Sequence, residues 1–337
     1  MTEMTVLNGV AIEELLTIPM AVEAVEQAYL EKSKGDAALW PMVFHEFDPG
    51  HADLDIKSGD LGGLGFYGLK VVSWFGANPG KGLPALYGTS LLFDLATGAP
   101  RALLNAGPIT DFRTGAAGAI GAKYLARPDA GTLLMAGTGA LAPYLIAATL
   151  YLLPQIKTVY VTNPHHPECS AAACEAITPQ VEKLLSGCGG CHAAIAAAPD
   201  LEKAVRHSDM ILTASPAREP FIKAEWVQPG THISCVGADM SGKQEVDSAL
   251  FASAKVFGDD TAQCLSVGEC EVPYKAGVFS GHICEIGGVI SGAEAGRTDA
   301  SDITIFDSTG IALQDIATAA ALLQAAQETG KGQAVTL

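Results

Sequence analysis

Positive charge is scarce in this 337-residue chain: 20 lysines and arginines face 37 aspartates and glutamates, for a net charge of −17. Phosphate backbones and anionic lipids repel such a protein, which argues against nucleic acid and membrane surfaces as partners. Long apolar runs are missing too, because the longest, residues 139–153, is interrupted by Pro143 and is too short for a bilayer. Residues 1–10 lack the basic start of a signal peptide, so we expect a cytoplasmic protein.

Charged residues make up only 17% of the chain and hydrophobic residues 49%. That composition can bury a large core, and the length suffices for two domains. Eight cysteines are scattered along the chain, as expected for thiols that are mostly reduced and buried. Only Cys188 and Cys191 form a close pair, beside His192. A zinc site needs four ligands and no second pair lies at a fitting spacing, so we expect no metal.

Near its middle the chain carries a dinucleotide-binding pattern. Residues 132–136 are a short apolar run, a glycine turn and a long apolar helix follow, and residues 156–161 are rich in β-branched side chains. The turn has the G-x-G-x-x-A form: Gly137, Thr138, Gly139, Ala140, Leu141, Ala142. Gly137 permits the tight turn, Gly139 lets the backbone approach a pyrophosphate, and the helix N-terminus attracts phosphates. The alternative is a plain βαβ turn, but the strand–turn–helix–strand context favours an NAD or NADP site.

The acid that grips the ribose 2′-hydroxyl in NAD enzymes is absent from the end of the next strand. Asn163, Pro164, His165 and His166 stand there instead. An asparagine beside a histidine that can be protonated would tolerate a 2′-phosphate, although the same residues also suit an ordinary surface turn. The sequence therefore leaves NAD and NADP both open.

Strands and helices keep alternating after this unit. The expected strands are residues 192–197, 209–213, 231–237, 254–257 and 302–306. This rhythm predicts a parallel sheet covered by helices on both faces, and therefore an α/β fold with a Rossmann domain. Ligands of such sheets bind beyond the carboxyl ends of the strands, where polar residues gather in this sequence: Thr213, Ser215, Asp239, Asp307, Ser308 and Thr309.

The first 125 residues lack that rhythm, and we expect them to form a separate, mixed domain that supplies substrate and subunit contacts. Lys70 is the most notable residue there, because it lies inside an apolar strand between Leu69 and Val71. Burial lowers the pKa of an amine, which makes Lys70 a candidate acid–base group. The alternative is a lysine at a strand edge whose stem packs and whose amine reaches water.

A helix rich in glycine and alanine is expected to follow, capped by Thr110 or Asp111. Arg113 would then lie in its first turn, where the helix dipole disfavours a cation. It therefore needs an anionic partner. A cofactor phosphate or a substrate carboxylate would serve, and the alternative is an ion pair with Asp111 or Asp94.

Three long stretches make the sequence resemble a known family: RTGAAGAIGAKYLAR (113–127), VGADMSGKQEVD (236–247) and ITIFDSTGIALQD (303–315). With the glycine turn they resemble the ornithine cyclodeaminase/mu-crystallin family, and most of all its archaeal-type alanine dehydrogenases. The resemblance extends over about residues 5–325.

This resemblance implies a two-domain subunit. A Rossmann NAD(P)-binding domain would cover residues 126–309. Residues 1–125 and 310–337 would form a second α/β domain that binds substrate and joins two subunits into a homodimer.

The resemblance also assigns roles. Lys70 matches the family's acid–base lysine, Arg113 its arginine near cofactor and substrate, and Asp239 its aspartate after the fourth Rossmann strand. The residues expected to contact the cofactor are Thr89, Arg113, Gly137, Thr138, Gly139, Ala140, Asn163, His165, Thr213, Gly237, Lys243 and Ser308.

The chemistry that follows is the oxidation of an α-amino acid. Lys70 would take the proton of the amine, Arg113 would hold the carboxylate, and Asp239 would order the water that attacks the imine. We expect an NAD(P)-dependent oxidoreductase of the alanine dehydrogenase type, acting on a small amino or imino acid. The alternatives are a cyclodeaminase that releases ammonia and regenerates its cofactor, and a non-catalytic, crystallin-like nucleotide-binding protein.

One substrate position departs from the family. The arginine or lysine that usually follows the proline of the WPM segment, and binds the substrate carboxylate, is replaced by Met42. His45 or Lys57 could take its place, and the sequence therefore leaves the substrate open.

Overall fold

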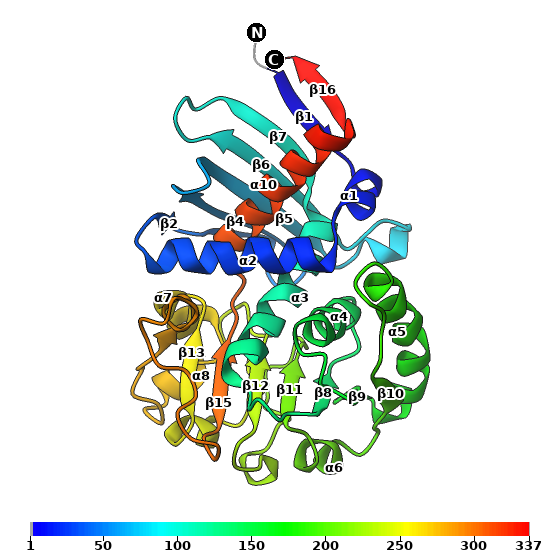
Figure 1. Cartoon of the computed structure of the whole chain (residues 1–337), viewed down its shortest axis with the longest axis vertical. Helices are drawn as coiled ribbons and strands as arrows, with labels where there is room; N and C mark the ends of the chain where they lie inside the picture. The colour runs from blue at the N-terminus through cyan, green and yellow to red at the C-terminus, as the bar shows by residue number, and fades with distance from the viewer. Residues whose placement is uncertain (1–2, 337) are drawn as a thin grey trace. The chain divides into compact units, whose positions relative to one another are not determined.

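A computed structural model describes residues 3–336, which form two compact units. Unit 1 contains the residues up to Arg113 and those from Ile311 onward, and unit 2 contains residues 114–310. Figure 1 shows both ends of the chain, coloured blue and red, in unit 1. The first boundary thus lies at residue 113, inside a helix, rather than at residue 125. In the part of the chain described, no helix is long and apolar enough to cross a membrane.

Unit 1 is built on an eight-stranded mixed sheet in the order β16–β1–β7–β6–β5–β4–β2, with β3 also paired to β4. Strands β1 and β7 run parallel, and the other neighbours are antiparallel. The strands are β1 (Glu3–Leu7), β2 (Ala37–Leu39), β3 (Val43–Asp48), β4 (Ala52–Leu61), β5 (Phe66–Phe75), β6 (Leu86–Asp94), β7 (Pro100–Asn105) and β16 (Gln333–Thr336).

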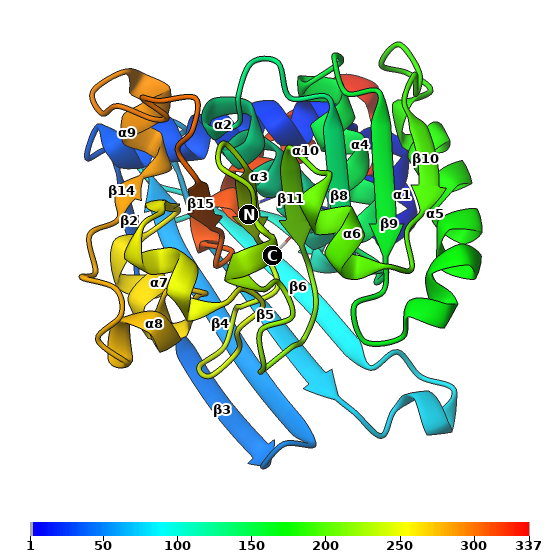
Figure 2. The same cartoon turned by 90° about the horizontal axis from the view of Figure 1, so that it is seen from below.

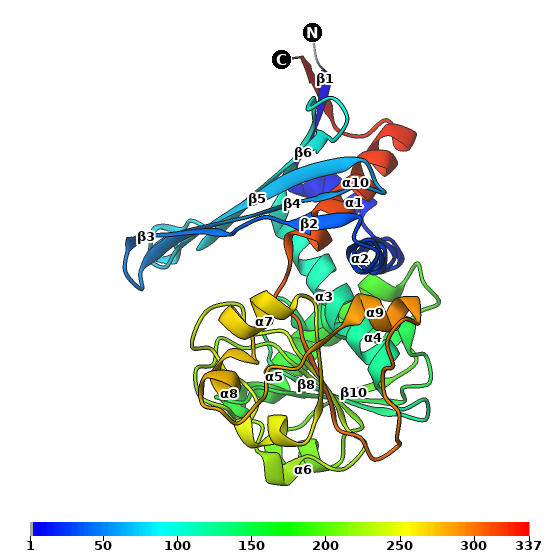
Figure 3. The same ribbon diagram turned by 90° about the vertical axis from the view of Figure 1, so that its left-hand side faces the viewer.

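Helices lie against this sheet. Helix α10 (Ala312–Thr329) packs on β4, β5 and β6, and α2 (Ile18–Ser33) packs on α10 (Figure 3). Helix α2 starts where the sequence predicts, since the Thr17 side chain accepts a hydrogen bond from the backbone N–H of Met20 at 3.3 Å. The remaining short elements are α1 (Gly9–Leu15) and the 3₁₀ turn η1 (Pro79–Lys81).

Helix α3 (Ala106–Leu125) begins earlier than expected. Its first turn is capped by Asn105, whose Oδ1 accepts a hydrogen bond from the N–H of Gly107 at 2.9 Å. Pro108 fits this first turn, because the N–H that it lacks would have no helical partner there. The expectation that Thr110 or Asp111 caps the helix is therefore wrong, and Arg113 lies about two turns inside it.

Unit 2 contains the predicted parallel sheet, in the order β10–β9–β8–β11–β12–β15–β13–β14. All its neighbours run parallel, and Figure 2 shows β11, β8, β9 and β10 side by side. The strands are β8 (Thr132–Ala136), β9 (Thr158–Thr162), β10 (Ala194–Ala197), β11 (Met210–Thr213), β12 (His232–Cys235), β13 (Lys255–Gly258), β14 (Cys284–Glu285) and β15 (Thr304–Asp307). This strand order confirms the Rossmann-type α/β fold.

The helices of unit 2 connect these strands. They are α4 (Ala142–Leu152), α5 (Ser170–Leu185), α6 (Leu201–Arg206), α7 (Thr261–Val267), α8 (Glu271–Lys275) and α9 (Ile286–Ser291), with 3₁₀ turns η2 (Pro167–Cys169), η3 (Ala224–Trp226) and η4 (Ser248–Ala252). The part of α3 in this unit packs very closely, as its composition predicts. A Cβ at Gly115 would lie 2.7 Å from the backbone of Tyr144, and one at Gly121 would lie 2.3 Å from Phe306.

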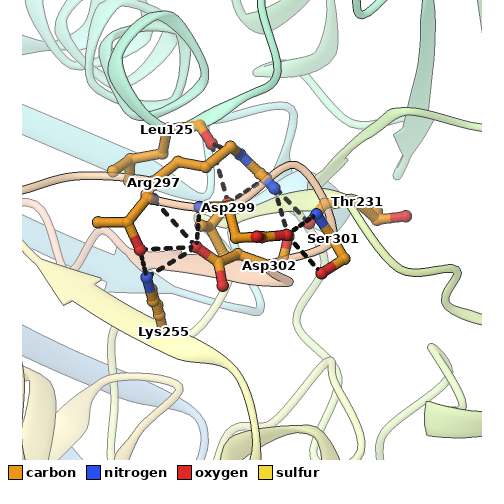
Figure 4. A network of polar contacts seen from close by, with 9 residues as sticks. Leu125, Thr231, Lys255, Arg297, Asp299, Ser301 and Asp302 are labelled. Carbon is orange, nitrogen blue, oxygen red and sulfur yellow. Dashed lines mark hydrogen bonds and ion pairs between the residues drawn. The ribbon is translucent and has the colours of Figure 1, made fainter.

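A polar network fixes the end of α3 (Figure 4). Arg297 donates from Nε to the carbonyl of Leu125 at 2.8 Å and from a terminal nitrogen to Thr304 Oγ1 at 2.9 Å. In the same loop Asp302 forms an ion pair with Lys255 at 2.7 Å. These residues lie around the start of β15, at the end of the sheet opposite the strand ends where ligands of such folds bind, and we regard the network as structural.

Candidate functional site

Lys70 is buried on β5, with 3% of its surface exposed. Residues 68 and 70 share one face of the strand, and a Cβ at Gly68 would lie 3.4 Å from Ile316 of α10. The Lys70 amine donates to Asp315 Oδ1 at 2.9 Å and to Thr110 Oγ1 at 3.4 Å. The alternative of a strand-edge lysine whose amine reaches water is therefore wrong.

Asp315, in the first turn of α10, also binds the second predicted cation. Arg113 donates from Nε to the same Oδ1 of Asp315 at 3.3 Å and from a terminal nitrogen to Gln314 Oε1 at 3.0 Å. Gln314 in turn donates to the hydroxyl of Tyr29 at 2.8 Å. One carboxylate thus joins Lys70 on the sheet to Arg113 on α3.

This arrangement corrects the ion pair expected for Arg113. The acid that binds it is Asp315, whereas Asp94 pairs with Arg101 at 3.3 Å. Asp315 lies within the ITIFDSTGIALQD stretch, but the sequence alone did not predict that its side chain faces Lys70. Burial raises the pKa of Asp111 to about 6, and the Arg113 charge only partly offsets that.

Burial and the surrounding charges place the pKa of Lys70 at about 8. Burial lowers this pKa and the charges of Arg113 and Lys57 add to that, while Asp315 opposes it. Burial alone would raise the pKa of Asp315, but Arg113 and Lys70 together hold it below its usual range. The amine of Lys70 can therefore lose and regain a proton close to physiological pH, as a general acid–base must.

Lys70 belongs to a row of side chains that crosses the sheet. Its partner on β4 is Lys57 and its partner on β6 is Ser90, so all three side chains point to the α10 side. Ser90 Oγ and Asp315 Oδ2 are buried, and neither has a hydrogen-bond partner within residues 3–336. Thr89, which the resemblance assigns to the cofactor, is exposed on the opposite face of β6.

The register also separates the two replacements considered for Met42. His45 pairs with Leu54, which pairs with Ser73, so His45 lies on the face away from Lys70. Met42 directly precedes Val43, the partner of Ile56, and the next step along β4 is Lys57. The structure thus brings Lys57, and not His45, to the face of the sheet that carries Lys70.

The glycine turn of unit 2 lies where the strand order reverses, between β8 and β11. Gly137 has φ 139°, and a Cβ there would lie 2.3 Å from the carbonyl oxygen of Ala214. At Gly139, by contrast, a Cβ would meet no atom of the described chain within 4 Å. Helix α4 follows with Leu141 at its N-cap and no side-chain cap from the described residues. Open space before uncapped N–H groups fits a pyrophosphate.

The turn after β9 is tied to the glycine turn. Asn163 donates from Nδ2 to Thr138 Oγ1 at 3.0 Å. Its Oδ1 accepts from the backbone N–H groups of His165 and His166, at 3.1 and 2.9 Å. The ring of His165 packs edge-on against Phe221. Asn163 therefore shapes the turn at the position where NAD enzymes carry their ribose-binding acid.

Glu245 organises the strand ends of the sheet, and sequence reasoning missed it. Its carboxylate is fully buried and accepts hydrogen bonds from Thr213 Oγ1 at 2.6 Å, from the N–H of Ser215 at 2.7 Å and from the N–H of Gly237 at 2.9 Å. Burial raises its pKa to about 7. Thr213 and Gly237, both predicted cofactor residues, are thus held by one side chain from the VGADMSGKQEVD stretch.

The remaining predicted residues lie in loops beyond β12 and β15. Asp239 is half exposed and pairs with Lys243 at 2.5 Å. Ser308 is buried, and its N–H donates to the carbonyl of Cys235 at 2.9 Å. Unit 1 therefore holds Lys70, Arg113 and Lys57, and unit 2 holds the glycine turn with Asp239, Lys243 and Ser308.

Comparisons with known proteins cover both units. The sequence matches the model of the ornithine cyclodeaminase/mu-crystallin family over residues 2–330. Alanine dehydrogenase of Archaeoglobus fulgidus is 34% identical over 99% of this chain and 98% of its own. A solved archaeal alanine dehydrogenase dimer with bound NAD is 35% identical over 99% of each chain, with a TM-score of 0.86. The iminosuccinate reductase of Paracoccus denitrificans in complex with NAD+ is 31% identical over 99% of this chain and 100% of that chain, with a TM-score of 0.89.

Proposed function

Because the chain belongs to the ornithine cyclodeaminase/mu-crystallin family, we propose that it is an NAD-dependent oxidoreductase of an α-amino or α-imino acid. The observation that carries the proposal is the buried amine of Lys70, which Asp315 holds and whose pKa is about 8. Two similar proteins support it by name, since one is an alanine dehydrogenase, the other an iminosuccinate reductase, and both structures contain NAD.

The glycine turn is the proposed site of the cofactor. Gly139 leaves room for a pyrophosphate at the N-terminus of α4, and Thr138 and Asn163 line the same turn. Gly137, Ala140, His165, Thr213, Gly237, Lys243 and Ser308 complete the proposed contacts. Bound there, NAD would supply the acceptor or donor for a hydride at the carbon that carries the substrate nitrogen.

Lys70 is the proposed acid–base group. In the oxidative direction the neutral amine of Lys70 takes a proton from the substrate ammonium. This step is needed because only a neutral substrate amine can push electrons toward the departing hydride. In the reductive direction the Lys70 ammonium returns that proton. The role of Asp239 in ordering the attacking water rests on the resemblance alone.

Arg113 and Lys57 are the proposed partners of the substrate carboxylate. Lys57 replaces the cation that is missing at Met42, since it lies level with Lys70 on the same face of the sheet and is only partly buried. The change Lys57→Met should raise KM for the substrate about tenfold and leave NADH affinity unchanged, with Lys57→Arg restoring much of the loss. An unchanged KM would remove Lys57 from the site.

A cyclodeaminase is the second candidate, and Asp239 is compatible with it as well as with a deaminating dehydrogenase. The resemblance implies that an acid at this position belongs to the deaminating branches of the family, whereas ketimine reductases carry a non-acidic residue. Such an enzyme would release ammonia and regenerate its cofactor. A crystallin-like binding protein would not need Lys70 and Arg113 around a shared carboxylate.

The deciding experiment is a substrate panel. Amino acids, and keto acids with ammonia, are followed at 340 nm with NAD(H) and NADP(H), and ammonia is assayed in parallel. An absorbance change with NAD(H) supports the oxidoreductase. Ammonia release from a diamino acid without absorbance change identifies a cyclodeaminase, and silence in both assays contradicts both enzymes.

We also propose that the protein is a cytoplasmic homodimer joined through the sheet of unit 1. Apolar side chains are exposed along this sheet and its loops: Val43, Phe44, Phe47, Phe75, Leu83, Leu86 and Tyr87. Exposed apolar patches of this kind mark protein contacts. The similar archaeal alanine dehydrogenase is a dimer. Light scattering should give twice the subunit mass, and Phe47→Asp should lower it; a monomeric parent protein would contradict this.

A further inference from the structure

Asp315 binds both cations that the proposed function uses, with Oδ1 2.9 Å from the Lys70 amine and 3.3 Å from Arg113 Nε. We propose that Asp315 is a positioning residue of the reaction, which aims the Lys70 amine and the Arg113 guanidinium and keeps Lys70 able to carry a proton. The inference rests on the proposed function, in which Lys70 is the acid–base group.

The carboxylate is held in a fixed place. Asp315 lies in the first turn of α10, and the residues on both sides of that turn pack on the sheet. A Cβ at Gly59 would lie 3.1 Å from Leu313, and one at Gly68 would lie 3.4 Å from Ile316. Gln314 is fixed as well, since it is fully buried between Arg113 and Tyr29. The backbone of Asp315 cannot retreat from Lys70 without lifting α10 from the sheet.

The charges around Lys70 make the carboxylate of Asp315 decisive for the protonation of the Lys70 amine. Lys57 faces Lys70 from β4 and Arg113 from α3, so two cations oppose a proton on the amine. Ser90 on β6 and Thr110 on α3 are neutral. Asp315 of α10 contacts the amine, while Asp53 and Asp55 precede Lys57 on the same face of β4. Without Asp315, Lys70 would lose its proton at a lower pH.

Asp315 also keeps bonding capacity for a reacting group. Its Oδ1 takes both cations, and its Oδ2 is buried without a hydrogen-bond partner from the described residues. Ser90 Oγ, on the other strand beside Lys70, is in the same condition. A buried oxygen without a hydrogen-bond partner lowers the stability of the fold. A single N–H or O–H donor beside Lys70 would give Asp315 Oδ2 its missing partner. The substrate amino group and a proton-carrying water both offer such a donor.

The test is Asp315→Asn, which removes the charge and preserves the shape. The pH–rate profile of amino-acid oxidation should keep its form, with its midpoint moved from about 8 to a pH lower by about one to three units, because a carboxylate contact of this kind changes a pKa by that amount. Glu31→Gln is the matched control, since Glu31 is also buried in unit 1 but binds the N–H of Gly63 at 3.1 Å. An unmoved midpoint in Asp315→Asn would overturn the proposal.

Asp315→Glu tests the positioning itself and guards against a variant that does not fold. It keeps the charge, so the midpoint should stay near that of the parent protein. The longer side chain displaces both cations, so kcat should fall about tenfold to a hundredfold, and KM should rise as well because Arg113 is a proposed partner of the substrate carboxylate. An unchanged kcat in this variant would show that the position of the carboxylate is unimportant.

A direct titration separates this inference from the proposed function. Lysine labelled at Cε with carbon-13 reports the pKa of Lys70 by NMR, with the resonance assigned from Lys70→Arg. A lower pKa in Asp315→Asn supports the role of Asp315 even when no amino or imino acid is turned over, which would defeat only the proposed function. Turnover with an unmoved Lys70 titration would defeat only the role of Asp315.

Discussion

The two units bury charge in opposite ways. In unit 1 the cations Lys70 and Arg113 share one carboxylate, that of Asp315. In unit 2 three buried acids lie close together at the strand ends, and backbone N–H groups and hydroxyls hold them. Glu245 binds Thr213 and two backbone N–H groups, Glu269 accepts from the N–H groups of residues 245 and 246, and Asp307 accepts from the N–H of Cys270.

The pKa values follow from this difference. Burial lowers the pKa of Lys70 to about 8, and it raises those of Glu245 and Asp307 to about 7. Burial disfavours the charged form in both units, but in unit 1 it leaves an amine ready for proton transfer. In unit 2 it leaves acids that carry protons near neutral pH and fix loops. In the proposed reaction the buried charge of unit 1 thus transfers a proton, whereas the buried acids of unit 2 hold loops in place.

Removing the amine of unit 1 should have the largest effect. In Lys70→Met we expect turnover to fall by about a hundredfold to ten-thousandfold, the range that general acid–base groups contribute. NADH binding, followed by fluorescence, should stay close to that of the parent protein, because the glycine turn belongs to unit 2. Lys81→Met, an exposed lysine of unit 1, is the control and should keep full activity. Equal turnover in both variants would show that Lys70 is not the acid–base group of the reaction.

The pH dependence of the rate is the next largest effect. Oxidation needs neutral Lys70, so kcat/KM should rise about tenfold per pH unit below about 8 and level off above it. Reduction needs the protonated form, so its rate should fall above the same pH. The two profiles are measured with one substrate pair. A flat oxidative profile between pH 6 and pH 9 would place the proton transfer on a different group.

Unit 2 was the more predictable part of the chain. Its parallel sheet follows from the regular alternation of apolar runs and helices. The glycine turn marks the place where the strand order reverses, between β8 and β11. Lys70 was found for a similar reason, because a lysine between Leu69 and Val71 breaks an apolar strand. Each of these features has a local signal in the sequence, which is either a periodic pattern or a single unusual residue.

The partners of these residues were not predictable. Asp315 is far from Lys70 in the sequence and meets it only because α10 packs across β4, β5 and β6. The start of α3 was misplaced because glycine and proline usually weaken a helix, whereas the Asn105 cap allows Gly107 and Pro108 in its first turn. Which residue faces which side also depends on register, and the pairing of Ser90 with Lys70 could not be read from the sequence.

The two glycines of the turn should separate stability from cofactor affinity. Gly137→Ala forces a Cβ into contact with Ala214 at a positive φ, so we expect it to cost about 1–3 kcal/mol of unfolding free energy. Gly139→Ala meets no described atom and should leave the unfolding free energy unchanged, yet weaken NADH binding about tenfold. Thermal denaturation and NADH titration measure the two. Gly139→Ala with unchanged affinity would move the pyrophosphate away from this turn.

The smallest effect concerns the acids of unit 2. Burial and the charge of Glu245 raise the pKa of Glu269 well above its usual range. An acid whose pKa is raised on folding contributes stability that is complete below its unfolded pKa, near 4.5, and is lost as pH rises toward the folded value. Glu269→Gln keeps an oxygen for the two N–H groups that Oε1 binds, and it cannot ionise.

Glu269→Gln should therefore differ least from the parent protein at pH 5, and its advantage in unfolding free energy should grow as the pH rises to 8. Chemical denaturation at the two pH values measures the difference. Asp299→Asn is the control of opposite sign, because hydrogen bonds from Ser301 lower the pKa of that exposed aspartate, so its loss should not stabilise the protein as pH rises. A parent protein that gains stability over Glu269→Gln at pH 8 would mean that Glu269 is ionised and paired, and unit 2 would then use buried charge as unit 1 does.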